Sequence, residues 1–337
     1  MPSRDRPGAA VLRGVGGYLP PRVVTNDDLA ALVDTSDEWI RTRTGIRERR
    51  FADEGSATSD LAVEAGRRAL ASAGGPDVDL VVVATSTPDR SCPATAPLVA
   101  SRLGLGTAAA FDLAAVCSGF VYALAQASAA VLAGLHRRAL VIGADQFTSI
   151  VDPRDRATSI LFGDGAGAVV VDGGDPDEAG SLGAFHLGSD GSAHDLITVP
   201  AGGSRVPHRE LVDASDAYFR MDGRAVFGAA VGAMSSSSRR ALALSGWSVE
   251  DVDWFVAHQA NERILRLVAH SLGISSDKVV IHLDRAGNTS AASIPLALAA
   301  HARTFAPHER ILLTAFGGGT TWGAATATWP RLVVQDL

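Results

Sequence analysis

The chain has 337 residues, of which 47% are hydrophobic and 20% charged, a balance typical of a folded protein with a large core. Its 30 Lys and Arg against 37 Asp and Glu give a net charge of −7 without a basic tail, which argues against nucleic acid as a partner. Two cysteines without zinc-ligand spacing argue against secretion and against a structural metal. No signal-peptide pattern and no apolar run of roughly 18 residues occurs, so we expect a cytoplasmic protein that does not bind a membrane.

Continuous apolar runs rich in Val, Ile and Leu predict strands that are buried on both faces of a sheet. In chain order these runs are residues 79–85, 138–144, 169–171, 253–258 and 310–316. Apolar, often Ala-rich segments predict helices at residues 57–73, 117–134, 225–245, 260–272 and 290–304. Together they indicate the α/β class, with helices covering central sheets.

The two halves of the chain repeat one order of elements, namely strand, helix and strand. Cys117 lies 21 residues before the strand that begins at Arg138, and Asn288 lies 22 residues before the strand that begins at Arg310. This match predicts one unit used twice, although short apolar runs also recur by chance in α/β chains. We expect irregular chain over residues 172–215 to join the halves, with a boundary near residue 180.

The glycine-rich segment 162–168 matches neither of the common phosphate-binding loops. It lacks the Lys-Ser/Thr of a Walker loop, and it precedes a strand instead of following one as a dinucleotide-binding turn does. We therefore expect its glycines to serve the close packing of backbone.

Cys117 is the first candidate for chemistry. The segment 111–122 places its thiol at the expected first turn of a helix, where unpaired N–H groups and the helix dipole favour the thiolate. A lone cysteine in an Ala-rich helix is, however, more often a small buried side chain. His258 and Asn288 also lie at a strand end or a helix start, where ligands bind in α/β proteins, so we predict that these groups share one site.

These three residues resemble, in type and in order, the β-ketoacyl-acyl carrier protein synthase III family of thiolase-fold condensing enzymes. Further matching segments are residues 34–40, 42–47, 162–167, 284–290 and 315–319. The resemblance implies a duplicated five-layer α/β/α/β/α thiolase fold, with Cys117 in an N-terminal half (1–180) and His258 and Asn288 in a C-terminal half (181–337). It also implies a C2 homodimer, because the acyl pocket of this family receives a residue from the partner subunit.

The activity that the resemblance implies is a decarboxylating Claisen condensation in fatty acid or polyketide initiation. Cys117 would attack an acyl-CoA, and His258 and Asn288 would then hold the thioester of malonyl-acyl carrier protein while carbon dioxide leaves. The resulting enolate needs N–H donors, which an imidazole and a carboxamide supply without adding a carboxylate. The backbone N–H groups of Cys117 and Gly318 would form an oxyanion hole for the tetrahedral intermediates.

CoA would act as a substrate carrier, and no metal or redox cofactor is implied. At the matching positions, Trp39 and Arg156 would sandwich the adenine, Arg43 would meet a phosphate, and Asn261 would contact the pantetheine arm. Arg224 departs from the Asn that many relatives carry, and we expect a cation there to add a phosphate contact.

Two further departures concern the carrier protein and the starter. Of the basic cluster that docks the acidic carrier protein, only Arg263 is clearly retained. Cys92 replaces a Phe of acetyl-specific relatives at the acyl pocket, which Phe316 would also line, so we expect starters larger than acetyl. The open alternative is a starter-unit acyltransferase of a secondary-metabolite pathway, which would pass the acyl group from Cys117 to another acceptor.

Overall fold

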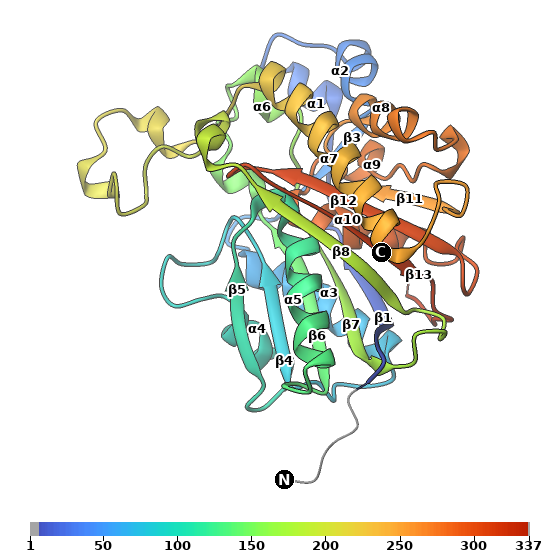
Figure 1. The fold of residues 1–337 in the computed structure, drawn as a ribbon. Coiled ribbons are helices and arrows are strands. Elements are labelled where there is room, and N and C mark those ends of the chain that lie inside the picture. Colours follow the sequence, from blue (N-terminus) through green and yellow to red (C-terminus); the bar gives the residue numbers. More distant parts are fainter. Residues whose placement is uncertain (1–6, 336–337) are drawn as a thin grey trace.

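The computed structural model describes residues 7–335, whose core holds two β-sheets (Figure 1). The first sheet has the strand order β1-β7-β6-β4-β5, and the second has the order β11-β12-β13-β8. The strands of the first are β1 (Ala9–Tyr18), β4 (Leu80–Ala84), β5 (Ala109–Leu113), β6 (Arg138–Asp145) and β7 (Gly165–Gly174). Those of the second are β8 (Leu182–Ser189), β11 (Trp254–Ala257), β12 (Arg310–Gly317) and β13 (Thr321–Thr328).

The two sheets share one pattern of strand directions. In the first, β1 and β7 pair antiparallel, as do β7 and β6, whereas β6, β4 and β5 run parallel. In the second, β8 and β13 pair antiparallel, as do β13 and β12, whereas β12 and β11 run parallel. In the second sheet, a parallel bridge between Phe255 and Val279 occupies the edge position that β5 has in the first sheet. The duplicated architecture predicted from the sequence is confirmed.

Helices form the other three layers. α3 (Thr58–Ser72) covers the outer face of the first sheet, and α7 (Gly223–Ser245) with α8 (Glu262–Leu272) covers the second. Between the sheets lie α5 (Gly119–Leu132) and α10 (Ser293–His301), which contact strands of both. α10 is buried almost all round, as an apolar helix between two sheets must be. The order of layers is therefore α/β/α/β/α.

Shorter elements cap one end of these layers, at the top of Figure 1. The short helices at this end are α1 (Asn26–Ala30), α2 (Asp37–Thr44), α6 (Arg156–Ser159) and α9 (Leu283–Ala286), whereas α4 (Ala96–Arg102) packs beside α3, β4 and β5. Two small hairpin-like sheets pair β2 (Arg22–Thr25) with β3 (Glu48–Phe51), and β9 (Ile197–Thr198) with β10 (Arg220–Met221). No helix within residues 7–335 is long and apolar enough to cross a lipid bilayer.

The predicted strands and long helices are confirmed within a few residues, but two predictions are wrong in part. Residues 172–215 are not all irregular, because β7 continues to Gly174 and β8 occupies Leu182–Ser189. Cys117 does not lie in the first turn of the long helix. It lies in a 3₁₀ turn, Val116–Ser118, and α5 begins at Gly119.

Candidate active site

The backbone around Cys117 is held in an unusual conformation. Val116 has φ 46°, a left-handed conformation that a β-branched residue rarely adopts. The end of β12 packs against this turn, and a Cβ atom on Gly317 would lie 2.7 Å from the backbone N of Cys117. A glycine is therefore required at residue 317 for the two backbones to meet, whereas a Cβ on Gly318 would face Ile197.

Asn288 is fixed by its neighbours on both sides. Its backbone bonds to the segment 161–163, through Leu161 O at 2.8 Å and Gly163 N at 3.0 Å. Its side-chain oxygen accepts from the backbone N of Ser290 at 2.9 Å, which leaves the amide NH₂ as the end free to donate. The glycine-rich segment thus packs backbone against backbone, as predicted, since a Cβ on Gly163 would collide with the carbonyl of Ala286.

His258 follows directly after β11. Its Nδ1 lies 2.7 Å from Oγ of Ser293, the first residue of α10. When the Ser293 hydroxyl donates this bond, Nε2 carries the ring proton and becomes a donor. Burial lowers the pKa of His258 to about 3, so the imidazole is neutral at physiological pH.

One short stretch of chain joins the three candidate residues. It runs from Asn288 to Ser293, and Oγ of Ser290 within it lies 3.7 Å from Sγ of Cys117. The same stretch contacts His258 through Ser293. Cys117, which belongs to the first sheet's half of the chain, thus meets groups from the second. All three residues are buried, with exposed fractions of 8% for Cys117, 4% for His258 and 6% for Asn288.

The electrostatics of Cys117 differ from the expectation of a thiolate. Burial raises the pKa of the Cys117 thiol to about 12, and the nearby Asp145 carboxylate adds to the rise, while the hydrogen bond with Ser290 opposes it. Desolvation of the sulfur therefore outweighs any benefit from the helix end. At rest the nucleophile is a thiol, and the imidazole of His258 is neutral.

Four of the predicted CoA-binding residues lie together. The guanidinium carbons of Arg43 and Arg156 lie 4.7 and 4.4 Å from the ring of Trp39. Asn261 donates to the backbone oxygen of Arg43 at 3.0 Å and caps α8. Because Arg156 already stacks on the indole, an adenine could enter between them only if the arginine moved away.

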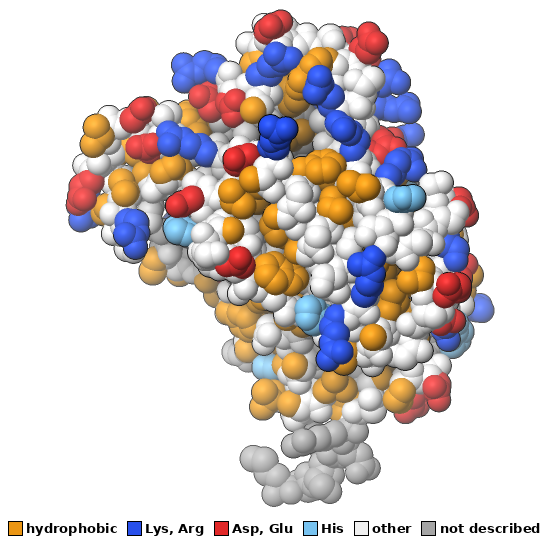
Figure 2. All heavy atoms as spheres, turned by 45° about the horizontal axis from the view of Figure 1, so that its top comes forward, with side chains coloured by type: hydrophobic (Ala, Val, Ile, Leu, Met, Phe, Trp, Pro, Cys, Tyr) orange, Lys and Arg blue, Asp and Glu red, His pale blue; other side chains and the backbone are white. Residues whose placement is uncertain are grey.

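Two further predicted residues lie near this cluster. Arg224 is in the exposed first turn of α7, and Arg263 is in the first turn of α8 with its guanidinium over the ring of Phe227, 6.0 Å away. The two helices pack together, so both cations lie on the same end of the molecule. Figure 2 turns this end forward and shows several Lys and Arg side chains gathered on it.

The two predicted acyl-pocket residues are not brought together within one chain. Cys92 is exposed in the loop between β4 and α4, whereas Phe316 is buried in β12. Sequence reasoning missed a cavity of about 440 Å³ beside the nucleophile turn, which Val116, Phe147, Ile197 and Phe219 line with other residues. These apolar side chains come from four separate segments, and nothing in their spacing indicates that they meet.

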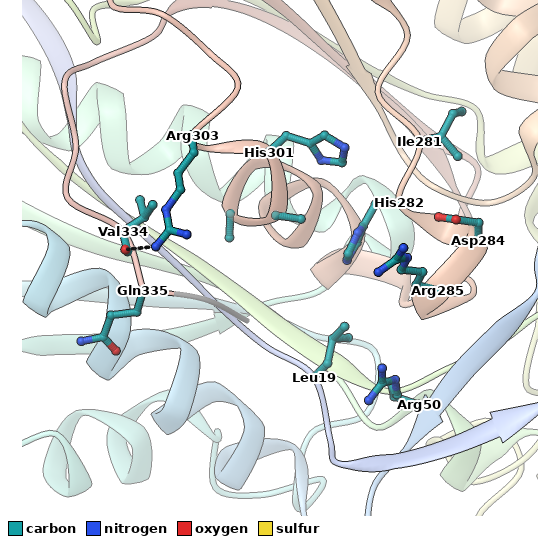
Figure 3. Close-up of a pocket in the computed structure, with 12 residues that line it drawn as sticks. Leu19, Arg50, Ile281, His282, Asp284, Arg285, His301, Arg303, Val334 and Gln335 are labelled. Carbon is teal, nitrogen blue, oxygen red and sulfur yellow. Dashed lines mark hydrogen bonds between the residues drawn. The ribbon is translucent and has the colours of Figure 1, made fainter.

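A second cavity, of about 560 Å³, is lined by residues of α9 and by the end of α10 and the chain after it (Figure 3). Arg50, His282, Arg285 and Arg303 line it, and its lining contains none of the three candidate catalytic residues. Within residues 7–335, no group of three or more His, Cys, Asp and Glu side chains could hold a metal ion.

Comparisons with known proteins agree with this geometry. Residues 111–191 match the family model of 3-oxoacyl-[acyl-carrier-protein] synthase III, and residues 242–329 match the model of its C-terminal part. The β-ketoacyl-[acyl-carrier-protein] synthase III 3 of Streptomyces coelicolor is 56% identical over 96% of this chain and 98% of its own length. The corresponding synthase III of Pseudomonas aeruginosa is 53% identical over 97% of this chain and 98% of its own.

Solved structures give the same result. The 3-oxoacyl-(acyl carrier protein) synthase III of Pseudomonas aeruginosa superposes with a TM-score of 0.91 at 51% identity, covering 96% of this chain and 99% of that one. The priming β-ketosynthase of the R1128 polyketide pathway gives 0.89 at 36% identity, covering 98% and 99%. The fold and the site thus define a thiolase-fold condensing enzyme. Within that class, the chain belongs to the β-ketoacyl-acyl carrier protein synthase III family.

Proposed function

We propose that this enzyme condenses an acyl-CoA starter with malonyl-acyl carrier protein through an acyl-Cys117 intermediate, and that the product is a β-ketoacyl thioester. The observation that carries the proposal is the contact of one stretch, residues 288–293, with both Cys117 and His258. The relatives in Streptomyces coelicolor and Pseudomonas aeruginosa bear the name of this activity.

In the first half-reaction, Sγ of Cys117 attacks the thioester carbonyl and CoA leaves as the thiol. The backbone N–H groups of Cys117 and Gly318 are proposed to bind the oxyanion, and the close approach of β12 at Gly317 supports this. Each such donor lowers a barrier by about 3 kcal/mol in a preorganised site.

In the second half-reaction, His258 and Asn288 bind the carbonyl oxygen of the malonyl thioester. The free amide NH₂ of Asn288 and the Nε2–H of a neutral His258 are both donors. As carbon dioxide leaves, negative charge develops on that oxygen, and these donors stabilise the enolate. The enolate carbon then attacks the acyl group on Cys117. The sulfur of Cys117 leaves as a thiolate, and a proton taken up from solvent restores the thiol.

The arginine and tryptophan cluster supports CoA as the first substrate's carrier, without a further cofactor. Trp39 and Arg156 would stack on the adenine, and Arg43 and Arg224 would meet phosphates. Arg263, on the same end of the molecule, is proposed to contact the acidic carrier protein.

The starter is proposed to be larger than acetyl. The cavity of about 440 Å³ beside Val116 has room for a longer or branched acyl chain. A partner's Cys92, entering from a second copy, would fill less of that space than a Phe. The edge strand β5 supports such a C2 homodimer. Phe111 on this strand is 43% exposed, and the outer edge of β5 pairs with no other strand of the described chain.

The test is to expose the enzyme to a panel of acyl-CoAs and measure the intact mass, then add malonyl-acyl carrier protein and measure carbon dioxide. We expect adducts with starters larger than acetyl, no adduct on Cys117→Ala, and carbon dioxide release with a β-ketoacyl product. Loading without carbon dioxide release would instead favour the starter-unit acyltransferase. Cytoplasmic location stays a prediction that cell fractionation checks.

A further inference from the structure

One buried arginine joins the elements that carry the tryptophan and arginine cluster. Arg49, in β3, has no exposed surface. Its Nη1 donates to Oδ1 of Asn26 at 2.8 Å, and its Nη2 donates to the backbone oxygen of Ile160 at 2.7 Å. We propose that Arg49 is a positioning residue, which holds α2 and α6 at the spacing that binds the adenine of CoA. This role rests on the proposed function, in which CoA carries the starter.

Asn26 makes the contact to α2. It is the first residue of α1, it is buried, and its Nδ2 donates to Oδ1 of Asp37 at 2.8 Å and to the backbone oxygen of Ile46 at 2.9 Å. Asp37 is the first residue of α2 and Ile46 follows its left-handed C-cap, Gly45, so one carboxamide holds both ends of this helix. A helix of eight residues depends on such tertiary contacts. The position of Trp39, in the first turn of α2, therefore depends on Asn26.

The backbone oxygen of Ile160 makes the contact to α6. Ile160 is the C-cap of α6, a helix of four residues that begins with Arg156. The last carbonyl groups of a helix have no partner within it, and Arg49 supplies a donor here. Among the described residues, no hydrogen bond joins α2 to α6 directly. Arg49 thus links, through Asn26, the two helices whose side chains Trp39 and Arg156 are stacked.

The adenine site needs fixed helices because it is closed at rest. The guanidinium of Arg156 covers the face of the Trp39 indole that the base would take. When the Arg156 side chain moves aside, the gap that it leaves keeps its width only if the backbones of α2 and α6 stay in place. Both backbones are bonded to Arg49, directly or through Asn26, so this arginine sets the width of the gap.

The aliphatic stem of Arg49 packs against the turn that carries Asn288. A Cβ atom on Gly163 would lie 3.1 Å from Cβ of Arg49, and one on Gly287 would lie 2.9 Å from it, so the lack of side chains there lets the stem approach. Gly287 precedes Asn288, and the backbone N of Gly163 donates to the backbone oxygen of Asn288 at 3.0 Å. Arg49 therefore ties the position of the adenine site to that of the turn carrying a candidate catalytic residue.

The contacts of Arg49 require an arginine. Burial lowers the pKa of Arg49 to about 10, so the group is still a cation at neutral pH, and its two shortest bonds have the length of charge-assisted hydrogen bonds. The planar guanidinium presents its donors at fixed angles, which lets Nη1 and Nη2 bond acceptors on two separate elements. The single nitrogen of a lysine cannot take both places. Arg49→Lys therefore keeps the charge and removes the connection.

The test compares two acyl donors that differ only in the nucleotide. One is the acyl-CoA that loads best, and the other is the same acyl group on pantetheine, which lacks the adenine and its phosphates. Single-turnover loading of Cys117, followed by intact mass, gives a maximal rate and a half-saturating concentration for each donor. In Arg49→Lys we expect the half-saturating concentration of acyl-CoA to rise about fivefold or more at an unchanged maximal rate, the effect of losing one stacked cation. Loading from acyl-pantetheine is expected to equal that of the wild type.

Arg50→Lys is the matched control. Arg50 is the next residue of β3, but its guanidinium pairs with Glu48 and lines the cavity of Figure 3, so loading from both donors is expected to stay at the wild-type level. Asn26→Asp is a second variant that cuts only the contact to α2. It keeps the oxygen that accepts from Arg49 and places a second oxygen against the Asp37 carboxylate, so the rise for acyl-CoA alone is expected again.

The outcomes separate this role from the proposed function. An equal loss for both donors in Arg49→Lys, or the same rise in Arg50→Lys, would overturn the positioning role and leave the proposed function standing. Equal half-saturating concentrations of the two donors in the wild type would do the same, since the nucleotide would then not be recognised. A wild type that loads from neither donor would overturn the proposed function. If Arg49→Lys does not fold, Asn26→Asp decides, and wild-type loading from acyl-CoA in that variant would overturn the positioning role.

Discussion

At the scale of single residues, the separate roles of Cys117 in acyl loading and of Asn288 in decarboxylation are directly testable. Asn288 has its side-chain oxygen bonded to Ser290 and its NH₂ free, so it can only donate toward a substrate. In Asn288→Ala we expect acyl loading of Cys117 to be retained and decarboxylation to fall by at least about 100-fold, because one oxyanion donor is lost. Intact mass and carbon dioxide release measure the two steps separately. A variant that condenses at the wild-type rate would contradict the proposed role.

Also at this scale, the stacking of Arg156 on Trp39 predicts a change in substrate binding. In Arg156→Ala we expect the KM for acyl-CoA to rise about fivefold or more with a smaller change in kcat, because a stacked cation contributes about 1 kcal/mol or more. Arg154→Ala is the matched control, since Arg154 is exposed in the same loop and pairs with Asp152. Equal KM values for the two variants would argue against an adenine site here.

At the scale of elements, the packing of β6 against the turn before α10 fixes the site. A Cβ on Gly143 would collide with the carbonyl of Ala291, one residue after Ser290. Gly143→Ala is therefore expected to lower the free energy of unfolding by about 1–3 kcal/mol and to reduce activity. In Gly232→Ala, where a Cβ on α7 meets open space, we expect a gain of roughly 0.5–1 kcal/mol. Urea denaturation of both variants measures this difference.

The elements that could be predicted from the sequence were those whose apolar runs are continuous. β1 and β13 were not predicted, because β1 contains glycines and β13 is built of Gly, Ala and Thr apart from Trp322. The glycines of β1 are needed for packing, since a Cβ on Gly16 would collide with α3 at Ala69. The boundary between halves at residue 180 stays a prediction.

The same limit applies to the site. Cys117, His258 and Asn288 could be identified because they end strands or begin helices in segments of recognisable type. Ser290 and Ser293 lie within or next to those segments but carry a common side chain, and their roles depend on contacts that only the fold creates. Asp145 could not be identified from the sequence, because nothing there indicates that it is buried near the nucleophile. The expected thiolate disagrees with the structure mainly because burial of the sulfur raises the pKa of Cys117, with a smaller contribution from Asp145.

At the scale of the whole molecule, the free edge of β5 predicts a dimer. We expect sedimentation velocity to give a dimer for the wild type and a monomer for Phe111→Glu, because a charge on an edge strand opposes pairing with a second copy. Leu135→Glu is the control, as Leu135 is 75% exposed in the turn after α5 and is not part of β5. A wild-type monomer would remove the proposed contribution of Cys92 to a partner's pocket.

The buried, protonated state of the Cys117 sulfur has a practical consequence for the enzyme under oxidative stress. Peroxides convert thiolates, and not thiols, to sulfenic acid, and they must reach the sulfur to do so. An enzyme whose nucleophile is buried and protonated at rest should therefore keep its activity through long storage in air without a reducing agent.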